Sequence, residues 1–351
     1  MARTLFTADF RAPRWLQSPR VQTCIPHMIL RPSVRYETEL LELPDGGFIE
    51  LAWSCPAPVS QHAPLLVILI EEESSLKQSP SARMLMAAAV RNQWRAVVVH
   101  YRGCGNLENH HSRDYHAGDT ADLYWVMSKL ARRYPVAPKM GIGFGLGGNV
   151  LVKLVAEQGG DGLPLSGVIS ASAPLDLANR SDCINTGPAR RYQRRLLQRK
   201  YRKILAKQEI DRFPLDIARH QLERLDTLWA FDNEVTAPLY GFSSASDYYR
   251  RSSAGQMLDR IELPTLILHA QDDPYLSGDC FMRMPLPSAN VRIEIAPQGG
   301  HLGFIEQEKG LMHSWMIRRI ADQIQRWSVA PGLQTLHELN QEALFQGKSN
   351  D

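Results

Sequence analysis

Apolar residues along the chain occur in two alternating patterns, short continuous runs and stretches with helical spacing. The runs at 65–70 and 96–100 are typical of strands that are buried on both faces of a sheet. In 118–133 the apolar residues recur at the spacing of an amphipathic helix. The same criteria predict strands at 139–144, 168–171, 266–269 and 291–295, and helices at 81–92, 149–157 and 309–327. Strands that alternate with helices favour a mostly parallel, doubly wound α/β sheet.

Two segments depart from this alternation. Residues 36–42 and 48–53 flank Pro44-Asp45-Gly46-Gly47, which predicts a β-hairpin. Residues 175–255 are mostly helix-like and polar, and we interpret them as an insertion between two strands. The expected organisation is an N-terminal arm (1–34), an α/β domain (35–330) that carries a helical cap at about 175–255, and a polar C-terminal tail (331–351).

Composition narrows the class of protein. The chain has 351 residues, of which 44% are hydrophobic and 22% charged, as in ordinary globular proteins. A net charge of +3 gives no reason to expect a nucleic-acid partner. No apolar run approaches the roughly 20 residues that span a bilayer, and the N-terminus lacks the apolar core of a secretory signal. The five cysteines form no CxxC pair, so we expect no zinc site, no disulfide framework and a cytoplasmic location.

The sequence Gly143-Phe144-Gly145-Leu146-Gly147 lies between a predicted strand and a predicted helix. This is the context of a nucleophile elbow, G-x-S-x-G, in which a serine at the central position attacks a carbonyl group. Here the central residue is Gly145, which has no hydroxyl group. The motif therefore indicates a hydrolase fold, whereas the nucleophile itself is missing.

An acid and a histidine follow in the order that such a site requires. Asp272 and Asp273 come directly after the strand at 266–269, and we select Asp273 as the orienting acid, with Asp272 second. His301 lies in a glycine-rich loop after the strand at 291–295. Alone, the Asp-Pro pair fits a turn and the histidine fits a structural role. Their order, each after a strand, favours the remnant of a catalytic triad.

The oxyanion hole of such a site uses the N–H of the residue after the nucleophile, here Leu146, and a second N–H from the loop after an earlier strand. That loop reads Glu71-Glu72-Glu73-Ser74-Ser75. Carboxylates at this place would oppose a developing negative charge. The alternative is that they point to solvent, as runs of charged residues usually do. Either way, this loop lacks the glycine that would let the backbone approach a substrate.

Together these residues resemble the α/β-hydrolase superfamily and, within it, the YheT-type group of carboxylesterases, which is related to the embryogenesis-associated hydrolases. The resemblance is spread along most of the chain. It rests on Gln22-Thr23, Leu43-Pro44-Asp45-Gly46, Arg102-Gly103-Cys104, Tyr115-His116 with Gly118, Thr120 and Asp122, Gly147-Gly148-Asn149, Tyr192-Gln193-Arg194, Asp247-Tyr248-Tyr249, Asp272-Asp273-Pro274 and Gly299-Gly300-His301 with Gly303-Phe304.

The resemblance implies hydrolysis of short-chain or lipid esters by a serine, an aspartate and a histidine, under a cap formed by residues 175–255. Asp273 and His301 match the family pattern. Gly145 departs from it, because the family has serine there, and the family's His-Gly pair falls on Ile70-Glu71. The resemblance therefore predicts a pseudoenzyme, a hydrolase fold without serine-esterase chemistry.

Three alternatives remain open from the sequence. His301 with Asp273 could activate water directly, or Ser74, Ser75 or Cys104 could replace the missing nucleophile. The basic stretch 190–207 could hold an anionic membrane or an acidic partner, although a solvated helix with Leu196, Leu197, Ile204 and Leu205 facing inward is the simpler interpretation. Glu71–Glu73 with Asp273 and His301 could hold a hard cation. We predict no cofactor and no metal, a small ester or acyl ligand, and structural or surface roles for His110, His111 and His116.

Overall fold

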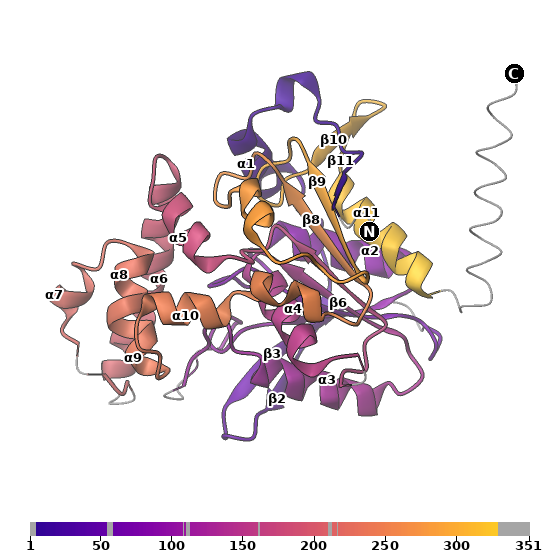
Figure 1. The fold of residues 1–351 in the computed structure, drawn as a ribbon. Coiled ribbons are helices and arrows are strands. Elements are labelled where there is room, and N and C mark those ends of the chain that lie inside the picture. Colours follow the sequence, from indigo (N-terminus) through magenta and orange to yellow (C-terminus); the bar gives the residue numbers. More distant parts are fainter. Residues whose placement is uncertain are drawn as a thin grey trace, which may run out of the picture.

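A mixed sheet of nine strands runs through the centre of the computed structural model, which describes residues 5–54, 59–107, 109, 113–160, 162–209, 213–215 and 217–328 (Figure 1). In spatial order the strands are β1 (Leu5–Thr7), β9 (Val291–Ala296), β8 (Thr265–Ala270), β7 (Gly167–Ala171), β6 (Lys139–Phe144), β4 (Leu65–Leu69), β5 (Arg95–Val99), β3 (Phe48–Ser54) and β2 (Tyr36–Glu42). Neighbours from β1 to β5 are parallel. Within the described sheet, β3 runs in the opposite direction and pairs antiparallel with both β5 and β2. The predicted strands, the hairpin and the mostly parallel sheet are confirmed.

Helices cover both faces of this sheet. α3 (Ala121–Arg133) and α4 (Leu146–Gln158) contribute to the apolar core on one face, and α2 (Pro80–Arg91) and α11 (Trp315–Ser328) to the core on the other. Because both faces are covered, β4, β6, β7 and β8 are buried along their whole length, which explains their continuous apolar runs. The predicted α/β-hydrolase-type doubly wound architecture is confirmed.

The register of the parallel strands sets the place of the site. Leu69 at the end of β4 pairs with Gly143 of β6, and His269 of β8 pairs with Ile295 of β9. The loops after β4, β6, β8 and β9 therefore open at the same edge of the sheet. In open α/β sheets this carboxyl edge is where ligands bind.

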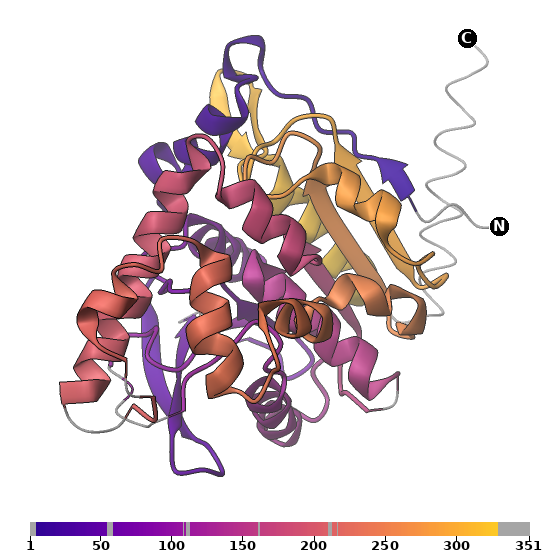
Figure 2. The ribbon, with the colours of Figure 1, turned by 60° about the vertical axis from the view of Figure 1, so that its left-hand side comes forward.

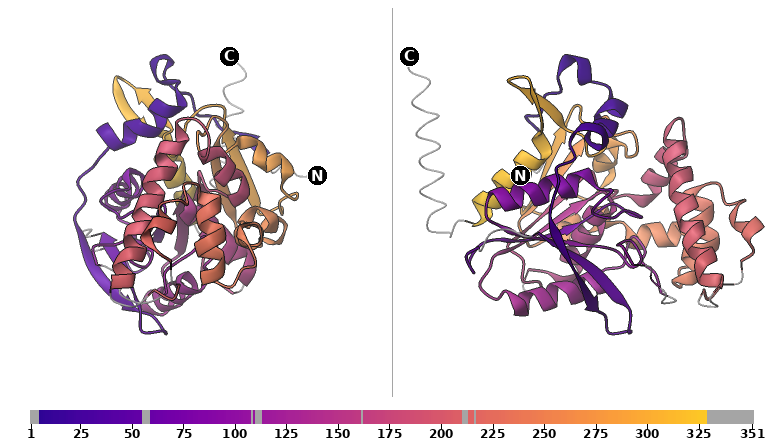
Figure 3. Two further views of the ribbon diagram at one scale, coloured as in Figure 1. Left: turned by 90° about the vertical axis from the view of Figure 1, so that its left-hand side faces the viewer. Right: turned by 180° about the vertical axis from the view of Figure 1, so that it is seen from behind.

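The segment between β7 and β8 forms a group of helices beyond one end of the sheet (Figures 1 and 2) and faces the viewer in the left panel of Figure 3. It contains α5 (Leu177–Ile184), α6 (Ala189–Glu209), α7 (Arg219–Leu222), α8 (Leu228–Phe231), the π-helical turn η2 (Asp232–Thr236), α9 (Ala237–Leu239) and α10 (Ala245–Ser252). These helices have an apolar cluster of their own, with Ile184, Leu197 and Phe231 buried in it. We call residues 175–255 the cap.

The N-terminal segment is tied to the sheet. β1 pairs in parallel with β9, and α1 (Pro19–Ile29), which follows the 3-10 turn η1 (Arg14–Leu16), contacts the segment after β9. Short 3-10 turns also lie at η3 (Ala254–Arg260) and η4 (Gly278–Arg283). The predicted tail at 331–351 lies outside the described residues, as do His110 and His111. Among the described helices, none combines the length and apolar character needed to cross a membrane.

The prediction of a single helix over 309–327 was wrong at its start. Residues before Trp315 form an antiparallel hairpin of β10 (Ile305–Glu308) and β11 (Leu311–Ser314). Lys309 and Gly310 both adopt positive φ, 49° and 82°, so the chain reverses there and cannot continue a right-handed helix. α4 also begins earlier than the predicted 149, at Leu146, directly after the turn at Gly145.

Candidate active site

Gly145 forms the turn between β6 and α4. Its φ of 54° and ψ of −126° lie in a region that L-residues rarely adopt, as at a nucleophile elbow. The flanking glycines are required by close packing: a Cβ on Gly143 would lie 2.4 Å from Gly148, and one on Gly147 would lie 2.7 Å from the Leu69 backbone. The turn thus has the geometry of a nucleophile elbow, but no side chain projects from its tip.

His301 and Asp273 form a hydrogen-bonded pair at the carboxyl edge of the sheet. His301 Nδ1 lies 2.8 Å from Asp273 Oδ2, and the Asp273 side chain is fully buried. Asp272 instead accepts a hydrogen bond from the Gly300 backbone N–H at 2.9 Å. The structure therefore brings Asp273 to the imidazole and uses Asp272 to hold the histidine loop. His301 and Gly145 line the same small space. With Nδ1 bonded to Asp273, Nε2 is the ring nitrogen that would act on a group there.

The N-terminal helix α1 fixes the histidine loop. Thr23 Oγ1 accepts a hydrogen bond from the His301 N–H at 2.9 Å. The buried Gln22 amide donates to the carbonyls of Leu16 and Ile305, both at 3.1 Å, and accepts from the Ile305 N–H at 2.8 Å. The sequence showed Gln22-Thr23 only as part of a family resemblance. Its contacts are with a loop almost 280 positions away, so no local pattern could reveal them.

Glu71 lies against the elbow. An ideal Cβ on Gly145 would be 3.2 Å from Glu71 Cγ, which is tighter than nearly all real contacts of this kind. The Glu71 Oε2 atom is buried and has no hydrogen-bond partner among the described residues. The space lined by Glu71, Gly145, Leu146, Arg180, Tyr192 and His301 measures about 10 Å³, roughly one water molecule. The loop after β4, from which the sequence predicts the second oxyanion donor, thus places the Glu71 side chain beside the elbow.

Glu72 and Glu73 do not point to solvent, so that alternative is wrong. Both residues are 7% exposed. Glu72 forms an ion pair with Arg180 of α5, and Glu73 forms one with Lys203 of α6 at 2.7 Å. Because a charged group is costly to bury without a partner, these carboxylates need the cap cations in order to be stable there.

The environment of Glu73 is strongly cationic. Tyr115 donates a hydrogen bond to its Oε1 at 2.8 Å, and Arg199 donates to its backbone carbonyl at 2.8 Å. Burial acts to raise the pKa of Glu73, but Lys203, Lys200 and the hydrogen bonds outweigh burial and hold the pKa below its ordinary value. Glu73 is therefore a carboxylate that bonds the cap to the sheet domain.

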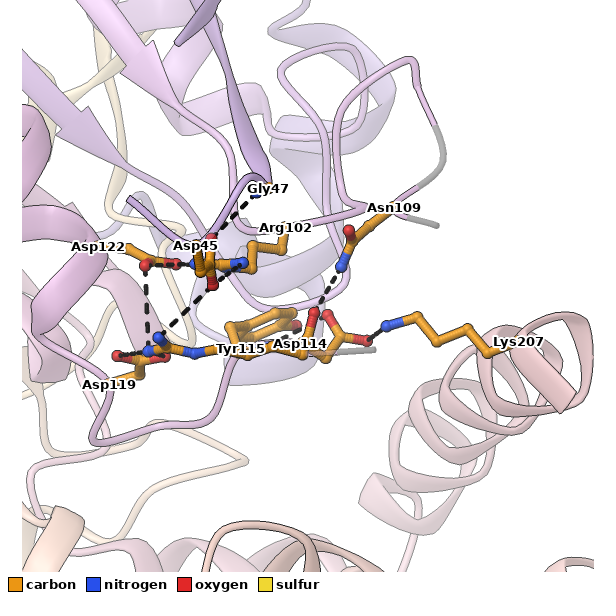
Figure 4. Close-up of polar contacts among 10 residues, drawn as sticks. Asp45, Gly47, Arg102, Asn109, Asp114, Tyr115, Asp119, Asp122 and Lys207 are labelled. Carbon is orange, nitrogen blue, oxygen red and sulfur yellow. Dashed lines mark hydrogen bonds and ion pairs between the residues drawn. The ribbon is translucent and has the colours of Figure 1, made fainter. Parts of the chain in front are cut away.

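A further ion pair and a neighbouring charge network appear in Figure 4. Lys207 of α6 lies 3.3 Å from Asp114. Nearby, the buried Arg102 contacts Asp122 at 2.6 Å and Asp45 at 2.9 Å, which joins the β2–β3 turn to α3. Arg102, Asp45 and Asp122 all belong to the family resemblance, and their role here is structural.

Cys104, one alternative nucleophile, is buried and accepts a hydrogen bond from Lys203 Nζ at 3.1 Å. Burial and the nearby Glu73 charge raise its thiol pKa to about 12, so the reactive thiolate is scarce. Ser74 is likewise buried, and the structure shows no contact between it and His301. His116 lies apart, against Tyr240 and Phe242, and burial lowers its pKa to about 4.

The cap helix α6 has the inward apolar stripe that the sequence predicts, and it also directs cations inward. Leu196, Leu197 and Ile204 are buried and Leu205 is half-buried, as expected for an inward apolar stripe. Sequence reasoning missed that Lys200, Lys203 and Lys207 also face the sheet domain. For the suggested cation site, no three acidic, histidine or cysteine groups within the described ranges are arranged to hold a metal.

The chain is similar to known proteins both in sequence and in fold. The chain is 37% identical over 320 residues to the Escherichia coli strain K12 protein named "Putative esterase YheT", covering 90% of this chain and 93% of that protein. It is 28% identical to the monoacylglycerol lipase of Saccharomyces cerevisiae, covering 70% of this chain and 56% of the relative. The structure superposes on that of the Pyrococcus furiosus esterase Pf2001 with a TM-score of 0.54 at 12% identity, covering 92% of this chain and 100% of the esterase chain. At this low identity the similarity is one of fold. No family model matches the chain.

Proposed function

Because the chain belongs to the YheT family of α/β-hydrolases, a family of ester hydrolases, we propose that it is a member that has lost serine-type ester hydrolysis. The observation that carries this proposal is the pairing of Gly145 with Glu71. The nucleophile position has no side chain, and Glu71 Cγ lies 3.2 Å from where that side chain would begin. The nucleophile position and the oxyanion loop are therefore both altered, at the place where they contact each other.

The expected loss of activity is large. In a well-studied serine protease, removing the nucleophile costs about 10⁶ in turnover. A carboxylate beside the oxyanion position adds repulsion to the developing negative charge. The purified chain should therefore show neither labelling by a fluorophosphonate probe nor turnover of p-nitrophenyl acetate above buffer. Stoichiometric labelling of the unmodified chain would refute the proposal.

A second candidate function rests on the complete His301–Asp273 pair. With Nδ1 held by Asp273 at 2.8 Å, the imidazole could deprotonate a water molecule in the small space beside Gly145. Activity of this kind would not label with a fluorophosphonate. It would disappear in His301→Ala and persist in Ser74→Ala and Cys104→Ala. Absence of hydrolysis for all acyl chain lengths would exclude this function.

The ligand that we propose is a small ester or acyl compound. A cavity of about 60 Å³ lies between the cap and the sheet domain, and Leu146, Tyr115 and Phe231 contribute to its lining. Leu146 also carries the N–H of the former oxyanion hole, so the cavity adjoins the site. Val235 also lines this cavity. Short-chain alkyl esters should raise the melting temperature of the wild-type chain, and a cavity-filling Val235→Trp variant should abolish that shift.

We further propose that the protein works in the cytoplasm. The four described cysteines, Cys24, Cys104, Cys183 and Cys280, are free thiols, as expected in a reducing compartment. Cell fractionation tests this location. Recovery of the chain from an oxidising compartment with its cysteines paired would contradict it.

A further inference from the structure

The long cap helix α6 is strongly basic. One of its sides faces the sheet domain and the other faces outward. Its cations are Arg190, Arg191, Arg194, Arg195, Arg199, Lys200, Arg202, Lys203 and Lys207, and Glu209 is its only acid. Lys203 and Lys207 form ion pairs with Glu73 and Asp114 of the sheet domain. Ion pairs with the sheet domain therefore explain the presence of cations on the inward side of α6. The cations on the outward side need a separate explanation.

The outward side carries exposed arginines with few acidic partners. Arg194 and Arg202 are exposed, and neither lies within 4 Å of a carboxylate oxygen in the portion of the chain that the structure describes. Arg190 approaches Asp226 at 3.5 Å, a long contact between two exposed groups. Like charges spaced four residues apart on a helix repel one another, so Arg190 and Arg194 destabilise α6 unless an anion lies between them.

These arginines border a groove on the outer face of the cap. The groove measures about 440 Å³, within the size range of ligand sites, and lies between α6 and α7. Leu197, Tyr201 and Leu222 line it with mostly buried apolar surface. Its charged lining consists of Arg190, Arg194, Arg202 and Arg219, together with the carboxylates of Asp226 and of Glu223, which pairs with Arg219. The groove thus has an apolar floor and a rim in which four arginines outnumber two carboxylates, which suits an amphiphilic anion.

We propose that this groove binds the phosphate headgroups of an anionic phospholipid bilayer and so docks the cap on a membrane surface. The planar guanidinium group is well suited to phosphate oxygens. Arg190 and Arg202 lie about 18 Å apart along the helix at 1.5 Å per residue. One free phosphate cannot span that row, whereas neighbouring headgroups of a bilayer can. The apolar floor then receives the glycerol and upper acyl region. This inference is independent of whether the chain hydrolyses esters.

The experiment is co-sedimentation of the full chain with vesicles of phosphatidylcholine alone and of phosphatidylcholine with phosphatidylglycerol at 3:1. The chain is expected to bind only the anionic vesicles, and binding should weaken steeply between 50 and 500 mM salt, as surface electrostatics requires. The variant Arg194→Gln/Arg202→Gln should reduce the partition coefficient by about 25-fold, since each arginine near such a surface contributes about five-fold.

The matched control is Arg91→Gln/Arg132→Gln, which removes the same charge from exposed positions at the ends of α2 and α3. It should lower binding by less than three-fold, and both variants should melt at the wild-type temperature. Equal losses in the two variants, or no binding to anionic vesicles, would overturn the proposal. Full competition by 5 mM inorganic phosphate would show a free-anion site instead. Equally tight binding to duplex DNA, lost in the same variant, would show a nucleic-acid surface.

Discussion

Glu71 and Gly145 face each other across the centre of the candidate site: a Cβ added to Gly145 would meet Glu71 Cγ at 3.2 Å. Glu71 lies at the start of the loop after β4, and Gly145 forms the elbow after β6. Because the two strands are hydrogen-bonded neighbours, the elbow without a side chain and the Glu71 carboxyl group lie at one place in the fold.

This contact predicts the stability of Gly145→Ser. The substitution should cost about 1–3 kcal/mol, because a non-glycine residue is strained at φ 54° and its Cβ crowds Glu71. Gly187→Ser is the matched control, since Gly187 has φ 51° but open space around its Cβ position. Urea unfolding should show a larger loss for Gly145→Ser, and adding Glu71→Gly should remove only the excess. Identical losses at the two glycines would show that Glu71 does not crowd the elbow.

The ion pair between Lys203 and Glu73 predicts the stability of the cap. Lys203→Met should destabilise the chain by on the order of 2 kcal/mol, because it leaves a 7%-exposed carboxylate with the more distant Lys200 as its cation. Lys77→Met, at an exposed position, is the control. Thermal or urea unfolding measures both. If Lys203→Met destabilises the chain no more than the control does, the ion pair does not hold the cap.

Glu73 also predicts a dependence on pH. Its pKa is lower in the folded chain than the ordinary value of 4.5. Its ionised form therefore contributes stability above about pH 4.5, and this contribution is lost as the pH falls through the folded pKa. Between pH 6 and pH 3.5 the wild type should lose more unfolding free energy than Glu73→Gln, measured by urea titration. Glu223→Gln, at an exposed position, should follow the wild type. Parallel curves for wild type and Glu73→Gln would contradict the assignment.

Gln22 predicts the order of the histidine loop. Gln22→Ala should cost about 3 kcal/mol, since it leaves the buried carbonyl and N–H groups of Ile305 without their partner. Hydrogen exchange at Ile305 should accelerate in this variant and stay unchanged in the exposed control Gln17→Ala. Unchanged exchange in Gln22→Ala would show that other contacts hold the loop.

Cysteine reactivity provides a test of the alternative nucleophile. At pH 8 iodoacetamide should modify the exposed Cys24 and leave Cys104 unmodified, because burial raises the pKa of Cys104 to about 12. Mass spectrometry of the folded chain identifies the modified sites. Rapid alkylation of Cys104 in the folded state would restore it as a candidate nucleophile.

The sequence predicted the parts of the structure that depend on local patterns. The apolar runs of β4 and β8, the hairpin around Gly46 and the helical spacing of α3 are local, and all were confirmed. The chain order of Gly145, Asp273 and His301 was readable because each follows a strand of the same sheet.

The remaining features depend on contacts between distant positions. Glu72 is buried only because Arg180 reaches it from α5, and Glu73 only because Lys203 reaches it from α6. A run of carboxylates alone gave no sign of these partners. The helix predicted from 309 failed because Lys309 and Gly310 reverse the chain through positive φ, which apolar spacing does not report.

We propose that loss of the serine and gain of Glu71 together removed serine-type hydrolysis from an otherwise retained site. The most direct measurement is the rate of fluorophosphonate labelling in the wild type, Gly145→Ser and Gly145→Ser/Glu71→Gly. We predict no labelling of the wild type, slow labelling of the single variant and the fastest labelling of the double variant, at residue 145 and dependent on His301. Labelling of the wild type, or equal rates in the two variants, would contradict this claim.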